Sequence, residues 1–174
     1  MRVIRNAIRA VLLDVDFYNA AEVDTRLTGQ AGLIVVIASG LAGVGSAIAL
    51  EDVSVLAAVL GGIVAGVVGW LLWSLASWLI GTRVFGGEAT YSAMLRVIGF
   101  AYTPLAIGVI PWLGFPGAAW MLVAAVVAFR EGLDISTPKA IGTMAVGWSL
   151  WLGVTVVLNL VLDFNLNARW PFPG

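Results

Sequence analysis

Five long runs of apolar residues, separated by short polar or charged stretches, dominate the pattern along this chain. The runs cover residues 30–50, 53–80, 93–110, 114–130 and 138–162. A helix needs about 20 consecutive apolar residues to cross the roughly 30 Å hydrocarbon core of a bilayer. The pattern therefore predicts an all-α polytopic membrane protein with five transmembrane helices in residues 30–162.

The boundaries of these runs carry residues that commonly stop or start helices. Residues 51–52 are both acidic and predict a very short turn between the first two spans. Residues 111–117 contain two prolines and two glycines and predict a loop on the same side of the membrane. Thr137 before Pro138 is typical of an N-cap followed by proline at the first helical position, which places the start of the fifth helix there. The fourth run has a short apolar centre, residues 118–129, and crosses only with residues from both flanks.

Residues 1–29 precede the first span and show a different periodicity. On a helical wheel the apolar residues share one face: Ile4, Ala7, Ile8, Val11, Leu12 and Val15. The opposite face is polar and mostly basic: Arg2, Arg5, Asn6 and Arg9. The pattern favours an amphipathic helix lying in the cytoplasmic headgroup region, its apolar side toward the acyl chains. A cytosolic helix packed on the rest of the protein is the alternative, because Leu13 and Asp14 break the periodicity.

The basic residues predict the orientation of the spans. Counting loops alternately from the N-terminus, eight of the nine Lys and Arg residues fall on one side, and Arg169 is the exception. Basic residues near span ends resist translocation, so the richer side is expected to be the cytoplasm. The N-terminus is then cytoplasmic, and residues 163–174 form a short tail on the other side.

Composition agrees with a membrane protein and excludes several kinds of chemistry. Hydrophobic residues make up 61% of the 174 and charged residues 11%, with a mean hydropathy of +1.02. Soluble domains contain about 25% charged residues. The net charge of −1 and the lack of a basic stretch predict no surface that binds nucleic acid. With no cysteine and no histidine, disulfides, thiol nucleophiles and the commonest metal and haem ligands are excluded.

Small residues in the first two spans form candidate helix-packing faces. Gly62 and Gly66 make a GxxxG pair in the second span, and Gly69 continues the same face. Ser39 and Gly43 make a similar pair in the first span. Small residues let helices approach closely, which supplies packing contacts in lipid. The contact is expected between the two spans of one chain, with an oligomer interface as the alternative.

Two pairs of tryptophans lie at i,i+3 spacing within predicted spans. Trp70 with Trp73, and Trp148 with Trp151, each share one face of a helix. Packing against neighbouring helices is the expected role. A groove for a pigment, a quinone or an acyl chain is the alternative, because flat apolar ligands favour aromatic walls.

Four basic residues are candidate anchors or contacts on the cytoplasmic side: Arg83, Arg96, Arg130 and Lys139. Of these, Arg96 is placed within an otherwise apolar run. It lies only about one turn inside, so its side chain can extend to the cytoplasmic headgroups. A specific partner, such as Glu88 or a lipid phosphate, is the alternative.

The spans offer little for catalysis or ion transport. An intramembrane aspartyl protease needs two facing aspartates, and no predicted span contains one. The span serines have no base within sequence reach. Ion-coupled carriers place ionisable residues at mid-membrane, where this chain has only residues such as Thr103, Thr155 and Asn159. We expect no enzymatic activity, no metal site and no cofactor, although a lipid can be bound.

Two stretches carry a resemblance to a known family. GEATYSAMLRVIGFAYTP at residues 87–104 resembles the inner loop and third span of the Yip domain family, with its glycine-rich loop, aromatic or polar stretch, arginine and proline. LDISTPKA at residues 133–140 is similar to the second inner loop of the family, where a serine or threonine is followed by Lys-Ala. The resemblance covers roughly the last half of the chain and implies five spans with a cytoplasmic N-terminus.

The resemblance also limits the expected function. Eukaryotic members act in membrane trafficking by binding small GTPases or shaping membranes through protein contacts. This chain resembles the prokaryotic type, which implies the inner or cytoplasmic membrane of a prokaryote. We expect an adaptor or accessory subunit of a larger membrane assembly, for example a bioenergetic complex, whose partners are membrane lipids and other membrane protein subunits. A lipid, quinone or pigment groove is the alternative, and a small channel or flippase is a third possibility.

Overall fold

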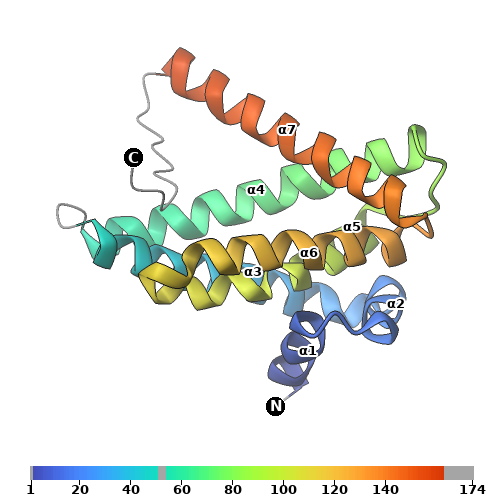
Figure 1. Cartoon of the computed structure of the whole chain (residues 1–174), viewed down its shortest axis with the longest axis horizontal. Helices are drawn as coiled ribbons and strands as arrows, with labels where there is room; N and C mark the ends of the chain where they lie inside the picture. Colours follow the sequence, from blue (N-terminus) through green and yellow to red (C-terminus); the bar gives the residue numbers. More distant parts are fainter. Residues whose placement is uncertain (1, 51–53, 163–174) are drawn as a thin grey trace.

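The structure, a computed structural model, describes residues 2–50 and 54–162, with side chains described as far as Ser149. Every regular element within this part is a helix (Figure 1), so the all-α prediction is confirmed. In chain order the elements are α1 (Arg2–Val11), α2 (Val15–Val23), η1 (Thr25–Leu27), α3 (Thr28–Ala49), α4 (Val55–Arg83), α5 (Tyr91–Ala101), η2 (Thr103–Val109), η3 (Pro111–Leu113), α6 (Gly114–Gly132) and α7 (Thr137–Leu162).

Four helical segments in the described residues are long and apolar enough to cross a membrane. They are Thr25–Ala49, Val55–Arg83, Tyr91–Val109 and Pro111–Gly132. The last of these takes residues from both flanks of its apolar centre, which gives the fourth run the length that it needs. Helix α7 is 26 residues long, but the side chains at residues 150–152 and 154–162 lie outside the described part. The count of five spans therefore stays a prediction.

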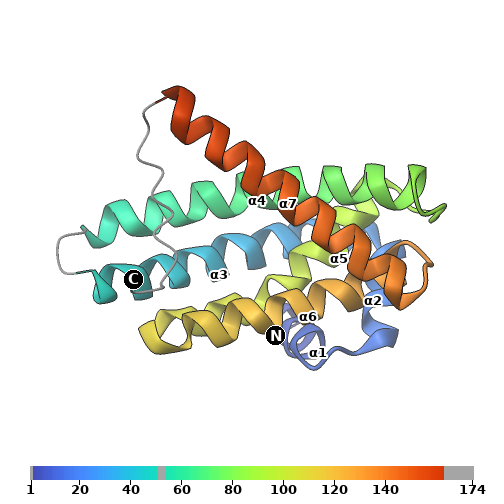
Figure 2. The same ribbon diagram turned by 45° about the horizontal axis from the view of Figure 1, so that its top comes forward.

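Helices α3 and α4 lie side by side as an antiparallel pair along the long axis of the molecule (Figures 1 and 2). The side chain of Ser54 accepts a hydrogen bond from the Ala57 amide and caps the start of α4. Such a cap satisfies one of the amides that have no partner at a helix N-terminus. At 29 residues α4 is longer than a hydrocarbon core requires, so it must tilt or extend past the core.

The third span changes its helical form at Pro104. Helix α5 ends at Ala101, and the chain continues as the 3-10 helix η2. Proline has no amide hydrogen to donate, so it starts a helical segment more readily than it continues one. The hydroxyl of Thr103 donates to the Phe100 carbonyl at 2.6 Å and satisfies one acceptor at the end of α5. The span is therefore built from two shorter helices.

Residues 111–117 were predicted to form an outer loop, and this prediction is wrong. They contain η3 and the first turn of α6, which begins at Gly114. Pro116 is accommodated because amides in the first turn of a helix have no intrahelical partner. A side chain at Gly117 would come within 2.9 Å of the Pro104 carbonyl oxygen, so glycine permits the close approach of α6 to η2 here.

The N-terminal segment is two helices rather than one. Leu13 takes a left-handed conformation (φ 58°) between α1 and α2, and Asp14 caps α2 by accepting from the Phe17 amide at 3.0 Å. Helix α2 buries Phe17 and Tyr18 against the bundle, and the Phe17 ring meets Phe100 edge-on at 4.8 Å. Helix α2 packs on the protein, and α1 keeps an exposed apolar face. A position of α1 in the headgroup region stays a prediction.

Helices α1 and α7 depart from the direction of the other long helices. Helix α1 lies crosswise to the bundle, since it is seen nearly end-on in Figure 2 while α3, α4 and α6 run across the view. Helix α7 contacts α4 and α6 near its own start and then diverges from them in both views (Figures 1 and 2).

Candidate interaction site at the charged end of the bundle

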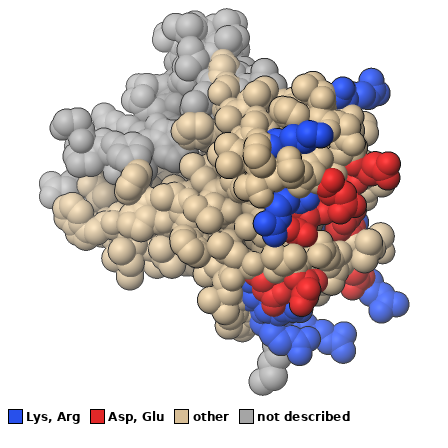
Figure 3. Space-filling view, turned by 45° about the vertical axis from the view of Figure 1, so that its right-hand side comes forward, with Lys and Arg blue, Asp and Glu red and all other residues tan. Residues whose placement is uncertain are grey.

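Lysine, arginine, aspartate and glutamate side chains gather at one end of the molecule (Figure 3). This end carries the two loops that were predicted to be cytoplasmic. The Lys139 ammonium donates to the Phe85 carbonyl at 3.0 Å, and the Glu88 amide donates to the Leu133 carbonyl at 3.1 Å. These bonds tie the α4–α5 loop to the α6–α7 loop and to the first turn of α7, so Arg83 and Lys139 lie at the same end of the bundle.

Three of the four predicted basic contacts lie on the surface of this end. Arg83 and Lys139 are exposed, and Arg130 is partly exposed and paired with the neighbouring carboxylate of Glu131. Exposed charges of this kind contribute little to stability in water. A contact of these side chains with headgroups or with a partner stays a prediction.

Arg96 differs from the other three because it is buried, with only 3% of its surface exposed. Its Nε donates to the Ala21 carbonyl at 2.8 Å, and a terminal nitrogen donates to the Glu22 carbonyl. The other terminal nitrogen contacts the Ser92 hydroxyl at 3.3 Å. The structure thus places Arg96 against the last turn of α2 instead of against Glu88 or the headgroups.

The contact with α2 has a clear physical cause. The last carbonyls of a helix have no intrahelical donor and carry the negative end of the helix dipole. A guanidinium presents several donors in a planar fork, so one side chain can satisfy two of these carbonyls. Arg96 therefore attaches α2 to the start of the third span.

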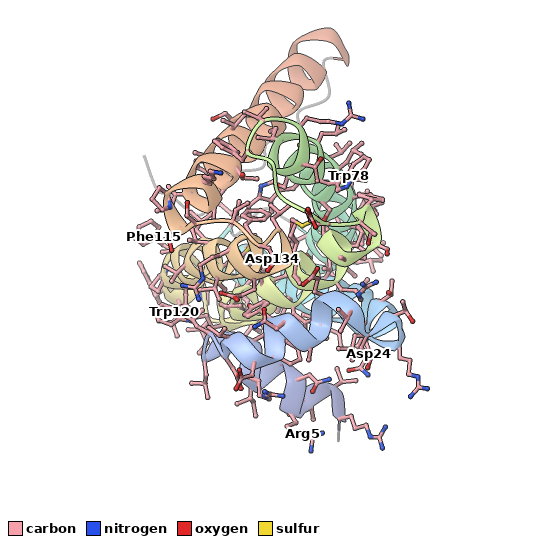
Figure 4. All side chains as sticks on the ribbon, turned by 90° about the vertical axis from the view of Figure 1, so that its right-hand side faces the viewer. Arg5, Asp24, Trp78, Phe115, Trp120 and Asp134 are labelled. Carbon is pink, nitrogen blue, oxygen red and sulfur yellow. The ribbon has the colours of Figure 1, made fainter. Side chains whose placement is uncertain are left out.

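Acidic side chains surround the end of α2. Burial raises the pKa of the Glu22 carboxyl, and the nearby Asp134 raises it further, while Arg96 acts in the opposite direction. Figure 4 shows Asp24 and Asp134 at this end of the molecule. At the start of α2, hydrogen bonding to Arg9 lowers the pKa of Asp14, which caps the helix.

The predicted small-residue faces of the first two spans meet within one chain. An added side-chain carbon at Gly62 would lie 2.9 Å from the Ser39 carbonyl oxygen, and one at Gly66 would lie 1.9 Å from the Ser39 hydroxyl. At Gly43 it would lie 2.5 Å from the Ala58 carbonyl oxygen. Gly69, the last member of the set, is also buried.

The two tryptophan pairs have different surroundings. Trp70 and Trp73 are buried, and the Trp73 ring meets Phe129 edge-on at 5.6 Å. The Trp70 indole donates to the Leu95 carbonyl at 2.9 Å. Trp148 is partly exposed on α7, and the side chain of Trp151 lies outside the described residues.

Some features of the structure depend on contacts between distant parts of the chain, which its sequence does not reveal. The indole of Trp120 on α6 donates to the Val11 carbonyl at 2.8 Å and joins α1 to the bundle across 109 residues of chain. An open groove of about 260 Å³ lies between α1 and η2. It is lined by Ile4, Ala7, Ile8, Val11, Leu12 and Thr103. The amphipathic periodicity of α1 identified the first five of these residues as one face, but the opposite wall depends on tertiary packing.

Within the described residues, no three acidic, histidine or cysteine side chains come together in a way that could hold a metal ion. The polar groups of the charged end instead form hydrogen bonds to backbone carbonyls and to neighbouring side chains. These bonds attach α2 to α5 and the α4–α5 loop to the connection between α6 and α7.

A family model described as the Yip1 domain matches residues 24–161. The match includes all four apolar spanning segments, and it leaves α1 and α2 outside. It extends well beyond the stretches at residues 87–104 and 133–140 that carried the resemblance. No curated protein and no solved structure matches the chain.

Proposed function

This chain belongs to the Yip1 domain family of membrane proteins, and we propose that it acts without catalysis, through protein contacts in the bilayer, as an adaptor or accessory subunit of a larger assembly. The main support is the outer face of α4. In the most apolar 18 residues of the α4 segment only 11% are buried within the chain, against 50% for the segment containing α3. Large apolar side chains of α4 are therefore exposed along its length, from Val55 to Leu79.

The exposed surface of α4 combines large and small residues in a pattern that suits a partner helix. Leu56, Leu60 and Val64 are exposed at intervals of four residues. Beside them, Ala57, Gly61 and Ala65 form a second exposed row with the same spacing. Small residues at this interval let another helix approach closely, and in lipid such packing must replace the hydrophobic driving force. The row faces away from the chain, since nothing lies within 4 Å of an added side-chain carbon at Gly61.

The proposal includes a specific membrane arrangement. Helix α7 forms a fifth span, the charged end faces the cytoplasm, and α1 lies in the plane of the inner headgroup region. The gathering of charged residues at one end supports this orientation, because basic residues are retained on the cytoplasmic side. The setting is the cytoplasmic membrane of a prokaryote, and no cofactor is required.

Native mass spectrometry of the untagged protein, extracted in mild detergent, tests the partner contact. We expect a stoichiometric membrane protein partner on the wild-type chain, and its loss when Gly61 and Ala65 are both replaced by leucine. Ala119→Leu, at an exposed position of α6, is the matched control and should keep the partner. A lone wild-type monomer that retains a pigment or a quinone would instead support a ligand-binding groove, and solute flux in reconstituted vesicles would support a channel or flippase.

A further inference from the structure

Helix α1 has three different faces, and one of them is an uncovered apolar wall. Its first face packs on the bundle, where Ala10 is fully buried and the Asn6 amide donates to the Gln30 side chain at 3.0 Å. A second face carries the three arginines of the helix. The third is apolar and exposed, with 67% of Ile4, 54% of Ile8 and 72% of Leu12 accessible.

The neighbours of α1 show which way these faces point along the bundle. The apolar face looks toward Thr103, which follows α5 at the middle of the third span and forms the opposite wall of the groove. The arginine face looks toward α2 at the charged end, because Arg9 pairs with Asp14 at 2.6 Å and its guanidinium lies 5.4 Å from the centre of the Phe17 ring. In the proposed membrane arrangement, the apolar groove therefore opens toward the membrane interior, and the arginines lie on the headgroup side.

We propose that the groove between α1 and η2 holds an acyl chain of an anionic phospholipid, whose phosphate lies beside Arg2 and Arg5. This site goes beyond the contact on α4 and uses different residues, although it shares with that proposal the placement of α1 at the inner leaflet. Helix α1 also precedes the residues matched by the family model.

The preference for an anionic lipid follows from the charges on α1. Residues 2–11 contain three arginines and no acidic residue. Because Arg9 is paired with Asp14, the charge available to a ligand comes from Arg2 and Arg5, which are both exposed. Arg5 and Ile8 are neighbours at i,i+3 on the helix surface, so a phosphate at Arg5 lies next to the mouth of the apolar groove.

The groove is formed by side chains that are held in place. The Trp120 indole fixes the C-terminal end of α1 through the Val11 carbonyl, and Asn6 fixes its middle through Gln30. Tryptophan combines an apolar ring with a polar N–H and is favoured at membrane interfaces, and Trp120 is 44% exposed beside the groove. A ligand entering here therefore meets a preformed wall.

Photo-crosslinking with phosphatidylglycerol that carries a diazirine in its acyl chain tests the site. The full chain is reconstituted in nanodiscs, and labelled peptides are mapped by mass spectrometry. We expect labelling to concentrate on residues 4–12 and near Thr103. Each basic residue near an anionic surface contributes about fivefold in affinity, so Arg2→Gln with Arg5→Gln should lower labelling by up to roughly thirtyfold.

Two controls separate the site from general contact with lipid. Arg26→Gln with Arg83→Gln removes two exposed charges outside α1 and should leave labelling unchanged. Ala7→Leu fills the groove without changing charge and should also abolish labelling, with the thermal midpoint reporting that the variant is folded. Equal labelling of the outer face of α4, equal labelling by phosphatidylcholine, or no effect of the Arg2 and Arg5 changes would each overturn the proposal.

The same variants distinguish this site from the partner contact. Loss of lipid labelling in the Arg2 and Arg5 variant is expected to leave the partner in the native mass spectrum. Loss of the partner in the Gly61 and Ala65 variant is expected to leave the labelling of α1. A negative result for the lipid site therefore leaves the proposed partner contact standing, and a negative result for the partner contact leaves the lipid site standing.

Discussion

Arg96 shows how a single charged residue can be accommodated within an apolar segment by satisfying the end of another helix. Its guanidinium bonds the Ala21 and Glu22 carbonyls, which would otherwise be acceptors without intrahelical donors. A buried charge without such partners is strongly unfavourable. The same contact joins the N-terminal helices to the domain that the family model matches.

Arg96→Gln is expected to lower the free energy of unfolding by about 3 kcal/mol, since each hydrogen bond to a charged group contributes roughly 1.5–3 kcal/mol. Arg96→Lys should recover only part of the loss, because an ammonium lacks the planar fork. Reversible unfolding in mixed micelles measures both. The exposed Arg83→Gln is the control and should change stability by less than about 0.5 kcal/mol. Equal stabilities for the two glutamine variants would contradict the role of Arg96.

Glu22 gives a prediction about pH. Because burial raises the pKa of its carboxyl in the folded state, the folded protein binds the proton more tightly than the unfolded chain does. Its contribution to stability is therefore most favourable at low pH and falls as pH rises above the ordinary value of 4.5. Glu22→Gln should raise the thermal midpoint at pH 7, and the difference from wild type should shrink as pH falls through that range. If the difference in thermal midpoint between the variant and the wild type grows as pH falls, burial does not raise the pKa of Glu22 as described.

At the residue scale, the sequence identified Arg96 as unusual but did not identify the groups to which it donates hydrogen bonds. Arg96 stood out because it interrupts an apolar run. Its acceptors are backbone carbonyls that lie 74 and 75 residues earlier in the chain, and every residue type supplies a carbonyl. No side-chain pattern can therefore identify them.

At the scale of elements, the α3–α4 pair depends on glycines that differ in their surroundings from their immediate neighbours. Gly62 and Gly66 face α3, whereas Gly61 faces outward, because successive residues of an α-helix point about 100° apart. Adjacent positions on one helix therefore have different surroundings.

Replacing Gly62 and Gly66 together with leucine is expected to destabilise the monomer. Overpacking costs about 1–3 kcal/mol at each site, and here the obstructing atoms include the backbone of α3. Unfolding in micelles and the elution volume on size exclusion measure stability and oligomeric state together. The Gly61→Leu control should leave the monomer as stable as wild type. If the Gly62 and Gly66 variant stays stable as a monomer and loses only an oligomer, these glycines form an intermolecular interface.

The apolar runs predicted the boundaries of helices well. Prolines and glycines, which are common in turns, predicted the boundaries poorly. The apolar runs locate four of the long helical segments to within a few residues, because the cost of exposing polar groups to lipid is large. Residues 111–117 look like a loop by composition, yet their prolines occupy first turns of helices. Proline alone does not distinguish the start of a helix from a loop.

At the scale of the whole molecule, the two charged loops lie at the same end, as the bonds from Lys139 to Phe85 and from Glu88 to Leu133 require. Alternating spans and the bias of basic residues predicted this relation between Arg83 and Lys139. The crosswise course of α1 and the divergence of α7 were not predicted, since both depend on contacts between distant parts of the chain (Figures 1 and 2).

The orientation of the chain can be measured with topology reporters. A reporter fused after Gly174 should report a non-cytoplasmic location, and one inserted at residues 86–88 a cytoplasmic one, because the charged end is expected to remain inside. Alkaline phosphatase and a fluorescent protein give complementary signals for the two locations. Cytoplasmic signals from both sites would show that α7 does not cross the membrane.

Adjacent glycines on α4 have a mechanical consequence. A rotation of α4 about its own axis by about 100° would bring Gly61 to the position of Gly62. The face of α4 proposed to bind a partner helix would then take the position of the face that packs on α3. Because the packing of α3 fixes the rotation of α4, weakening the α3–α4 contact is expected to weaken the proposed contact of Gly61 with a partner helix as well.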